Sequence, residues 1–314
     1  SRYQLEWMDD PWNDVAAAGR WLKTIEQHFR PDVVHLNGFA HASLDWHAPT
    51  LVAGHSCVLS WWQAVHGVPP PRRFGQYYRT VREGLESADR VIAPTSAMRN
   101  ALQTYYGPLP NTWVIYNGRN PALFRAGRKR DVALSVGRLW DEAKNVGAVA
   151  NAAADIEWPL RVAGESRHPN GKEIQLKNVE LLGHLSPEPL RRVYSESAVY
   201  AFPARYEPFG LSVLEAALSG CALLLGDIAS QRELWDGAAL FVSPDDQDAI
   251  RPPGPRFGHL VGVIHEILAQ GGQGTGRAGC GEEFRSALKA GRVGQDRQTG
   301  RAAGLIGLCQ RGRV

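Results

Sequence analysis

The sequence predicts an α/β protein of two doubly wound parallel-sheet domains, and three features lead to that prediction. Short apolar segments with the length of buried strands recur along the chain. Segments with helical character separate them, and strands that alternate with helices form parallel sheets. A short charged stretch that contains glycine, residues 125–130, divides the series in two and is predicted to be a linker. A chain of 314 residues is long enough for two domains.

The composition, with 44% hydrophobic and 21% charged residues, indicates an ordinary soluble globular protein. No apolar run approaches the roughly 18 residues of a membrane span, and no signal-peptide pattern opens the chain. Because the first residue is Ser1 and not methionine, we expect the chain to begin inside a longer protein. The cysteines lack paired metal-binding spacing, so we expect neither disulfides nor zinc, and a reducing cytoplasm. They are Cys57, Cys221, Cys280 and Cys309.

The net charge of +3 is unevenly distributed along the chain. Residues 251–314 carry a net charge of +6, whereas the preceding residues together carry −3. The basic segment contains only two aromatic residues, Phe257 and Phe284, so it offers no basic patch with interleaved aromatics. This pattern argues against nucleic-acid binding.

In the first half we expect a capped turn at residues 8–12, a helix over 15–29, a short helical loop after the first strand, and a helix through Tyr78 and Leu85. The predicted strands are 31–36, 49–55, 88–95 and 112–116. A doubly wound domain usually starts with a strand and a glycine-rich turn, and none precedes Val33. The front of this domain is therefore predicted to be missing.

The second half shows the same alternation up to residue 250 and then changes character. Its predicted strands are 131–137, 160–164, 179–183, 198–203, 222–227 and 239–242. Residues 251–314 hold 15 of the 33 glycines, and only Leu260–Leu268 resembles a short apolar helix. This tail is predicted to be poorly ordered, and a shifted reading frame in the gene is one explanation. We assign 1–124 to a partial first domain, 125–130 to the linker, 131–250 to the second domain and 251–314 to the tail.

The segment around which the chain is organised is Pro203–Ala216, which contains Glu207 and Glu215. A buried strand precedes it, and Leu211, Leu214 and Leu218 follow at helical spacing. Gly220 stands where the glycine after a helix C-terminus belongs.

A strand that ends in a tight glycine turn and opens a helix leaves free backbone N–H groups at one point. Those donors and the positive end of the helix dipole suit phosphate or sugar oxygens. Carboxylates beside an anion site need hydroxyl donors, which a sugar or a ribose diol supplies. We therefore expect both glutamates of this segment to face a bound ligand of that kind.

With Pro-Phe-Gly between its glutamates, the segment resembles the signature of the retaining glycosyltransferases of family 4, which is Glu, seven residues, Glu. The resemblance covers residues 30–250 and implies the GT-B fold, with the active site in a cleft between two domains. It implies that Glu207 lies nearest the transferred sugar and that Glu215 accepts a hydrogen bond from the nucleotide ribose. The backbone of Phe209, Gly210 and Leu211 would hold sugar and phosphate oxygens.

A second motif follows the first strand of the second domain, where Gly137 precedes Arg138, and Lys144 stands six residues further on. Both cations lie at the carboxyl edge of a strand and can converge on one anion, although two exposed basic residues on an ordinary loop would give the same pattern. Fixed cations there would stabilise a departing diphosphate. The spacing matches the donor-phosphate site of the family.

In the first domain, His55 ends the second predicted strand. A lone histidine there is usually a polar edge residue, but the resemblance implies that His55 lies beside the transferred sugar. His35 and Asn37 close the preceding strand, and contact with the acceptor and a plain polar edge both stay open. Glu233 matches a further glutamate common in the family. The tryptophans Trp61, Trp62, Trp140 and Trp235 are predicted to pack in the core or an interface rather than to stack on sugar.

The chain departs from the family pattern at several places. Ala204 stands where a serine is frequent, and Gly220-Cys221-Ala222 replaces Gly-x-Pro. In the GT-B fold a C-terminal helix usually crosses back onto the first domain, and nothing after Ile250 clearly supplies it. The first two departures look like subfamily variation, whereas the missing front and the unfamiliar tail lead us to expect weak activity at best from the chain as it stands.

The function implied is transfer of a hexose, with retention, from a nucleotide diphosphate sugar to an acceptor hydroxyl. The alternatives are a GT-B nucleotide-sugar epimerase, a phosphorylase that would require a pyridoxal-phosphate lysine, and a catalytically impaired nucleotide-sugar-binding fragment. No cofactor and no metal are implied, because the two cations and the helix N-terminus can neutralise the diphosphate. We expect no nucleic-acid partner and no integral membrane segment, with peripheral membrane contact left open.

Overall fold

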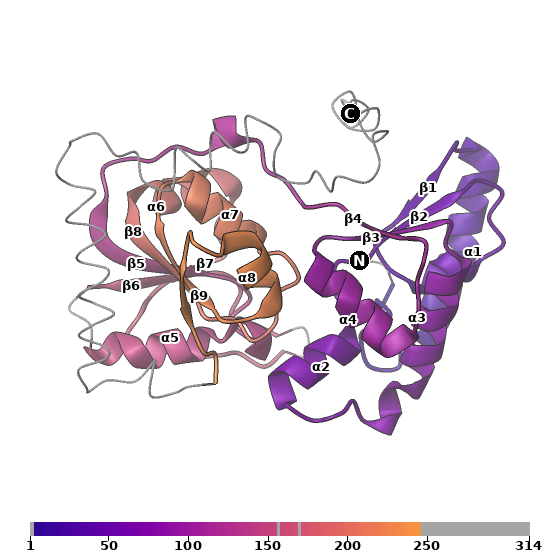
Figure 1. The fold of residues 1–314 in the computed structure, drawn as a ribbon, viewed down its shortest axis with the longest axis horizontal. Helices are drawn as coiled ribbons and strands as arrows, with labels where there is room; N and C mark the ends of the chain where they lie inside the picture. Colours follow the sequence, from indigo (N-terminus) through magenta and orange to yellow (C-terminus); the bar gives the residue numbers. More distant parts are fainter. Residues whose placement is uncertain (1–2, 156–157, 169–170, 246–314) are drawn as a thin grey trace. The chain divides into compact units, whose positions relative to one another are not determined.

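The computed structural model describes residues 3–155, 158–168 and 171–245, and within them the strands form two parallel sheets (Figure 1). The first sheet has the order β1-β2-β3-β4, with every neighbouring pair parallel. Its elements are α1 (Trp12–Phe29), β1 (Val34–Leu36), β2 (Thr50–Ala53), α2 (Val58–His66), α3 (Gly75–Ser87), β3 (Arg90–Ala93), α4 (Ser96–Tyr106) and β4 (Thr112–Val114). The short helical loop expected after the first strand is the 3-10 helix Ala40–Ser43.

The second sheet is also parallel throughout and has the order β10-β9-β8-β5-β6-β7. Its elements are β5 (Arg130–Val136), α5 (Val146–Ala152), β6 (Leu160–Ala163), β7 (Glu180–Gly183), α6 (Pro187–Glu196), β8 (Ser197–Phe202), α7 (Leu211–Leu218), β9 (Ala222–Gly226), α8 (Ala229–Trp235) and β10 (Leu240–Val242). The chain runs outward from β5 to β7 in one direction and from β8 to β10 in the other. The point where the strand order reverses therefore lies between β5 and β8, which is where open α/β sheets bind ligands.

Helices cover both faces of the second sheet, as doubly wound folds require. Tyr200 and Ala201 are consecutive in β8, so their side chains point to opposite faces. Ala201 packs in one hydrophobic cluster with Val146 and Val149 of α5. The Tyr200 ring lies 5.8 Å from that of Tyr194, which belongs to α6. Hence α5 and α6 cover opposite faces of this sheet (Figure 1).

The prediction of two parallel-sheet α/β domains is confirmed, and every predicted strand is present with slightly different bounds. The turn expected at residues 8–12 is a turn and bend over residues 6–10, and the expected cap is wrong, because α1 starts at Trp12 behind Pro11 and no side chain caps it. The exact domain boundaries stay predictions. The tail after residue 250, with its predicted helix, lies outside the described residues.

The predicted end of the motif helix is confirmed in detail. Gly220 has φ +77°, a left-handed conformation that glycine adopts without steric cost. Its N–H donates to the carbonyl of Ala217, and the N–H of Cys221 donates to that of Ala216. This pair of bonds is a Schellman motif, which satisfies the last carbonyls of α7 and turns the chain into β9.

Cys57 and Cys221 are buried free thiols. In the part of the chain that the structure describes, no helix combines the length and the apolar character needed to cross a bilayer.

A buried carboxylate anchors the end of α1. The Glu26 side chain is only 4% exposed, and it accepts hydrogen bonds from Lys23 and from the backbone N–H groups of His47 and Ala48. These donors, the Lys23 ammonium first among them, lower the pKa of Glu26 from its ordinary 4.5 to about 2. The carboxylate therefore ties α1 to the segment that leads into β2.

We predict that Glu26 makes the first domain acid-sensitive. A carboxyl group with a lowered pKa stabilises the fold fully above pH 4.5, and this contribution disappears as the pH falls from 4.5 towards 2. Glu26→Gln should be less stable at neutral pH and should lose less further stability across that window, as measured by urea unfolding at pH 7, 4 and 3. Glu86→Gln, which removes a 53% exposed carboxylate, is the matched control. Parallel pH profiles for Glu26→Gln and the wild type would contradict the prediction.

Candidate functional site

The loops after β5 and β8 lie together because the two strands are parallel neighbours, so both leave the same edge of the sheet. The loop after β5 contains Gly137, Arg138 and a short 3-10 helix, Glu142–Lys144. The N–H of Gly137 donates to the carbonyl of Ala163 at 3.0 Å, which holds the start of this loop against β6. The loop after β8 carries Glu207 and opens α7. The sequence motifs thus meet at the point where the strand order reverses.

An ion pair joins the two loops. Lys144 Nζ lies 2.8 Å from Glu207 Oε2, and the two side chains are only 14% and 15% exposed. The other carboxylate oxygen, Glu207 Oε1, accepts a hydrogen bond from the N–H of Phe209 at 3.3 Å. Two residues that are far apart in the sequence and were assigned to phosphate and to sugar therefore lie in direct contact.

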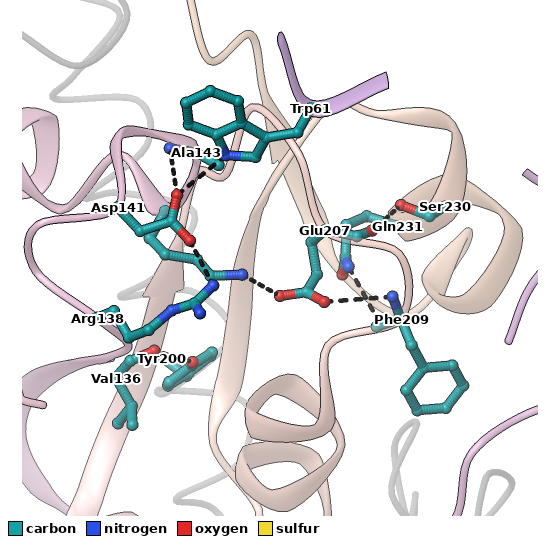
Figure 2. Close-up of polar contacts among 11 residues, drawn as sticks. Trp61, Val136, Arg138, Asp141, Ala143, Tyr200, Glu207, Phe209, Ser230 and Gln231 are labelled. Carbon is teal, nitrogen blue, oxygen red and sulfur yellow. Dashed lines mark hydrogen bonds and ion pairs between the residues drawn. The ribbon is translucent and has the colours of Figure 1, made fainter. Parts of the chain in front are cut away.

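Arg138 is held by a carboxylate that the sequence analysis did not single out. Its Nη2 lies 2.6 Å from Asp141 Oδ2, while the guanidinium stacks 4.9 Å from the centre of the Trp140 ring. The second oxygen, Asp141 Oδ1, accepts from the N–H of Ala143 and from Trp61 Nε1, each at 3.1 Å (Figure 2). Asp141 is nearly buried but leaves the Arg138 side chain 51% exposed, so Arg138 is fixed in direction and still accessible.

The start of α7 presents backbone donors beside this pair. Within the described part of the chain, the N–H groups of Leu211 and Ser212 have no hydrogen-bond partner. Gly210 precedes them with φ +90°, and Phe209 directs its N–H toward Glu207 while its ring points away (Figure 2). Leu211 and Ser212 are thus the free donors that a helix N-terminus offers to an anion.

Two side chains of helix α8 donate hydrogen bonds to the turn that contains Glu207 and Phe209. Ser230 Oγ donates to the carbonyl of Glu207, and Gln231 Nε2 donates to the carbonyl of Phe209 at 3.2 Å. Gln231 is fully buried. The conformation of the loop therefore depends on a rigid neighbour as well as on its own glycine.

We predict that Gly210→Ala disrupts this turn. A Cβ there would lie 3.0 Å from Val213 Cγ2 and 3.1 Å from Gln231 Nε2, in addition to the cost of about 1–2 kcal/mol for a left-handed non-glycine residue. Gly67→Ala is the matched control, since Gly67 has φ +68° and open space around it. Chemical denaturation should show a larger loss for Gly210→Ala than for Gly67→Ala. Equal losses would mean that packing around the turn does not constrain it.

Glu215, the second glutamate of the motif, also has a cationic partner. Arg119 Nε lies 2.5 Å from Glu215 Oε1, and the Glu215 side chain is 14% exposed. Arg119 lies in the segment between β4 and β5, and no local pattern in the sequence pointed to it. The structure therefore places the predicted ribose acceptor next to an arginine that sequence reasoning missed.

The histidine candidates gather at the carboxyl edge of the first sheet. His55 Nε2 lies 2.9 Å from Asn37 Oδ1, so this nitrogen donates. The surrounding protein removes water from the His55 ring, and the nearby charge of His35 acts in the same direction, so the pKa of His55 falls below its ordinary 6.5. The structure thus brings His35, Asn37 and His55 together.

We predict that removing the His35 imidazole raises the pKa of His55. In His35→Gln the charge repulsion is gone but the desolvation remains, so the pKa should move towards 6.5 without reaching it. Histidine ring proton shifts followed by NMR between pH 4.5 and 8 measure this directly, with His184→Gln as the control. A pKa for His55 at or above 6.5 in the wild type would contradict the arrangement.

Further polar contacts tie the motif loop to helices that follow strands of the first sheet. Tyr206 Oη accepts hydrogen bonds from the N–H of Cys57 at 3.0 Å and from Ser60 Oγ at 2.9 Å, both at the start of α2. Thr95, the N-cap of α4, donates to the carbonyl of Pro208 at 2.9 Å. Sequence reasoning missed Tyr206 and Thr95, because only long-range contacts give them their role.

Glu233 caps a helix. Its two carboxylate oxygens accept from the N–H groups of Ser96 and Ala97, at 2.7 and 2.8 Å, at the start of α4. One of these oxygens also accepts from Tyr116 Oη at 3.0 Å. These three donors hold the Glu233 carboxylate at the start of α4.

The four tryptophans make packing and polar contacts within the protein. Trp61 donates to Asp141, and Trp235 is 3% exposed. Trp62 packs edge-to-face against Phe74 with ring centres 5.5 Å apart, and Trp140 contacts both Arg138 and His168.

Two parallel-sheet α/β domains with a site at the carboxyl edge define the GT-B fold, and solved structures agree. A sucrose-phosphate synthase from Thermosynechococcus elongatus superposes with a TM-score of 0.69 at 19% identity, over 90% of this chain and 78% of that one. Anabaena Alr3699/HepE, solved in complex with UDP-glucose, gives a TM-score of 0.62 at 18% identity, over 79% of this chain and 71% of that one.

Family comparison covers most of the chain in two adjoining matches. Residues 2–123 match Glycosyltransferase Family 4, and residues 130–251 match Glycosyl transferases group 1. The chain therefore belongs to the group 1 and family 4 glycosyltransferases. The resemblance inferred from the Glu207–Glu215 motif is confirmed.

Curated relatives show the same affiliation at low identity. A glycogen synthase of Mycobacterium tuberculosis is 28% identical over 243 residues, which is 69% of this chain and 57% of that protein. A GDP-mannose-dependent alpha-mannosyltransferase of Mycolicibacterium smegmatis is 27% identical over 224 residues, or 66% of this chain and 58% of that protein. The chain thus spans less than two thirds of the length of these relatives.

Proposed function

We propose that the protein transfers a hexose from a nucleotide diphosphate sugar to an acceptor hydroxyl, with retention at the anomeric carbon. The observation that carries the proposal is the contact between Lys144 and Glu207 at the mouth of α7, where strand order reverses. A cation and free backbone N–H groups at this point match the diphosphate of a nucleotide sugar, and the carboxylate beside them matches its sugar. The diphosphate needs positive charge, and the sugar offers hydroxyl groups.

The diphosphate is proposed to lie against Lys144, Arg138 and the free N–H groups at the start of α7. Negative charge builds on the leaving diphosphate as the glycosidic bond breaks, and fixed donors stabilise it without reorganisation. Arg138 supplies a planar fork and Lys144 a point charge. Since these groups can neutralise the diphosphate, the proposal requires no metal ion.

The hexose is proposed to lie beside Glu207. When a phosphate oxygen takes over the Lys144 ammonium, the Glu207 carboxylate regains an acceptor site that a sugar hydroxyl can fill. Glu215 would accept a hydrogen bond from a ribose hydroxyl in the same way. Arg119 would then either leave the Glu215 carboxylate or stay bonded to it together with the ribose. His55 would stand on the acceptor side of the sugar, with His35 and Asn37 around it.

Retention follows in this proposal from the leaving group itself. The departing phosphate takes the proton of the acceptor hydroxyl on the same face from which it leaves. Since the leaving phosphate serves as the base and Glu207 accepts from a sugar hydroxyl, Glu207 needs no role as a covalent nucleophile.

The relatives support a nucleotide-sugar donor without fixing its base. The name of the Mycolicibacterium smegmatis protein specifies GDP-mannose, whereas the Anabaena protein was solved with UDP-glucose. A panel of UDP, GDP and ADP sugars is therefore the appropriate set of probes.

We predict that one class of nucleotide sugar raises the melting temperature of the protein, because a ligand that binds only the folded state stabilises it. Lys144→Ala should lose the shift with the nucleotide diphosphate and with its sugar conjugate. Glu207→Ala should keep the shift with the nucleotide diphosphate and lose the additional shift from the sugar. Transfer should fall at least about 100-fold in each variant, the usual scale for a transition-state contact.

Lys177→Ala, which removes an exposed lysine, is the control for charge. Wild-type binding and turnover by Lys144→Ala would refute the assignment of the diphosphate site. Donor binding without any transfer by the unmodified chain would instead favour a binding protein.

A further inference from the structure

Asn145, the residue after Lys144, has a backbone conformation that few residue types adopt. Its φ and ψ are 55° and 30°, which is the left-handed region, and it is 7% exposed. It ends the 3-10 helix that carries Lys144 and caps the start of α5. Asparagine and glycine tolerate this conformation best.

The side chain of Asn145 joins three loops at the carboxyl edge of the second sheet. Its Nδ2 donates to the carbonyl of Pro203, at the end of β8, at 3.0 Å. The same nitrogen donates to the carbonyl of Pro244, after β10, at 3.1 Å. Its Oδ1 accepts from Arg205 Nη1 at 2.5 Å. One buried amide therefore connects the ends of β5, β8 and β10.

Arg205 completes the link to the loop after β8. Its N–H donates to the carbonyl of Ala143 at 2.8 Å, and its Nε lies 3.2 Å from Asp245 Oδ1. The two loops are therefore bonded immediately before Lys144 and immediately after it. Lys144 stands between these bonds, and Glu207 follows Arg205 by two residues.

An amide is the side chain that this position requires. Both N–H bonds of Asn145 go to carbonyl oxygens, which cannot donate, and its oxygen accepts from an arginine. An aspartate would have the same size but would set a carboxylate against two carbonyl oxygens in a buried site. A glycine would keep the backbone conformation but lose all three bonds.

We propose that Asn145 is a positioning residue: it holds the Lys144 ammonium beside Glu207, at the place where the diphosphate binds. The proposal rests on the function proposed above, because it acts through Lys144. It is independent of the base and the sugar of the donor. The consequence is that Asn145 contributes to diphosphate affinity without touching the diphosphate.

This contribution to affinity can be measured by calorimetric titration. The ligand is the nucleotide diphosphate that gives the largest thermal shift. Asn145→Gly should bind it at least tenfold more weakly, and Asn145→Asp should show a loss of the same order. Asn178→Gly is the matched control, since Asn178 also has positive φ, at 61°, but is exposed. The control should bind like the wild type.

A double-mutant cycle separates positioning from general structural damage. If Asn145 acts through Lys144, Lys144→Ala/Asn145→Gly should bind no more weakly than Lys144→Ala alone. Full additivity of the two losses would overturn the proposal, as would wild-type affinity in both Asn145 variants. Where Asn145→Gly fails to fold, the isosteric Asn145→Asp takes its place in the same cycle.

The cycle also separates the positioning role of Asn145 from the proposed function on which that role rests. A loss of binding in Lys144→Ala with none in the Asn145 variants overturns the positioning role alone. Unchanged binding in Lys144→Ala overturns both.

Discussion

The ion pair between Lys144 and Glu207 is the interaction on which the candidate site depends. It joins the loops after β5 and β8, which the parallel sheet brings to one edge. Both side chains are mostly shielded from water, so each has lost hydration that the pair only partly repays. Such a pair is a poor source of stability but a suitable starting point for binding, because an anion and a hydroxyl group together can replace it.

The same arrangement recurs around the site. Arg138 pairs with Asp141, Lys144 with Glu207, and Arg119 with Glu215. Each of these three cations is therefore matched by a carboxylate. A nucleotide diphosphate sugar presents the complementary groups, with negative oxygens for the cations and hydroxyl groups for the carboxylates. Under the proposed function, these fixed groups would be preorganised for such a donor.

Much of the fold could be predicted from the sequence, because its signals are local. Buried strands such as 131–137 are short apolar runs, and Gly220 marks the end of α7 through its backbone conformation alone. The start of α1 was predicted incorrectly, because Pro11 takes the N-cap position without any capping side chain. The strand order, and hence the point where it reverses, follows from long-range pairing that no local pattern records.

The candidate site was predictable only in part, for the same reason. Lys144, Glu207 and Glu215 stand in motifs whose spacing is visible in the chain. Asp141 stood inside one of these motifs, and an aspartate before a short helix is a recognisable cap, so a local signal was available. Arg119 had no such signal, since only tertiary contact brings it to Glu215.

We propose that a diphosphate replaces the Lys144–Glu207 pair at the start of α7. A crystal structure of the protein soaked with a nucleotide diphosphate sugar from the class that binds tests this most directly. We expect phosphate oxygens within hydrogen-bond distance of Lys144 Nζ and of the backbone N–H groups that open α7, with Glu207 accepting from the sugar. A nucleotide bound elsewhere, with Lys144 still 2.8 Å from Glu207, would contradict it.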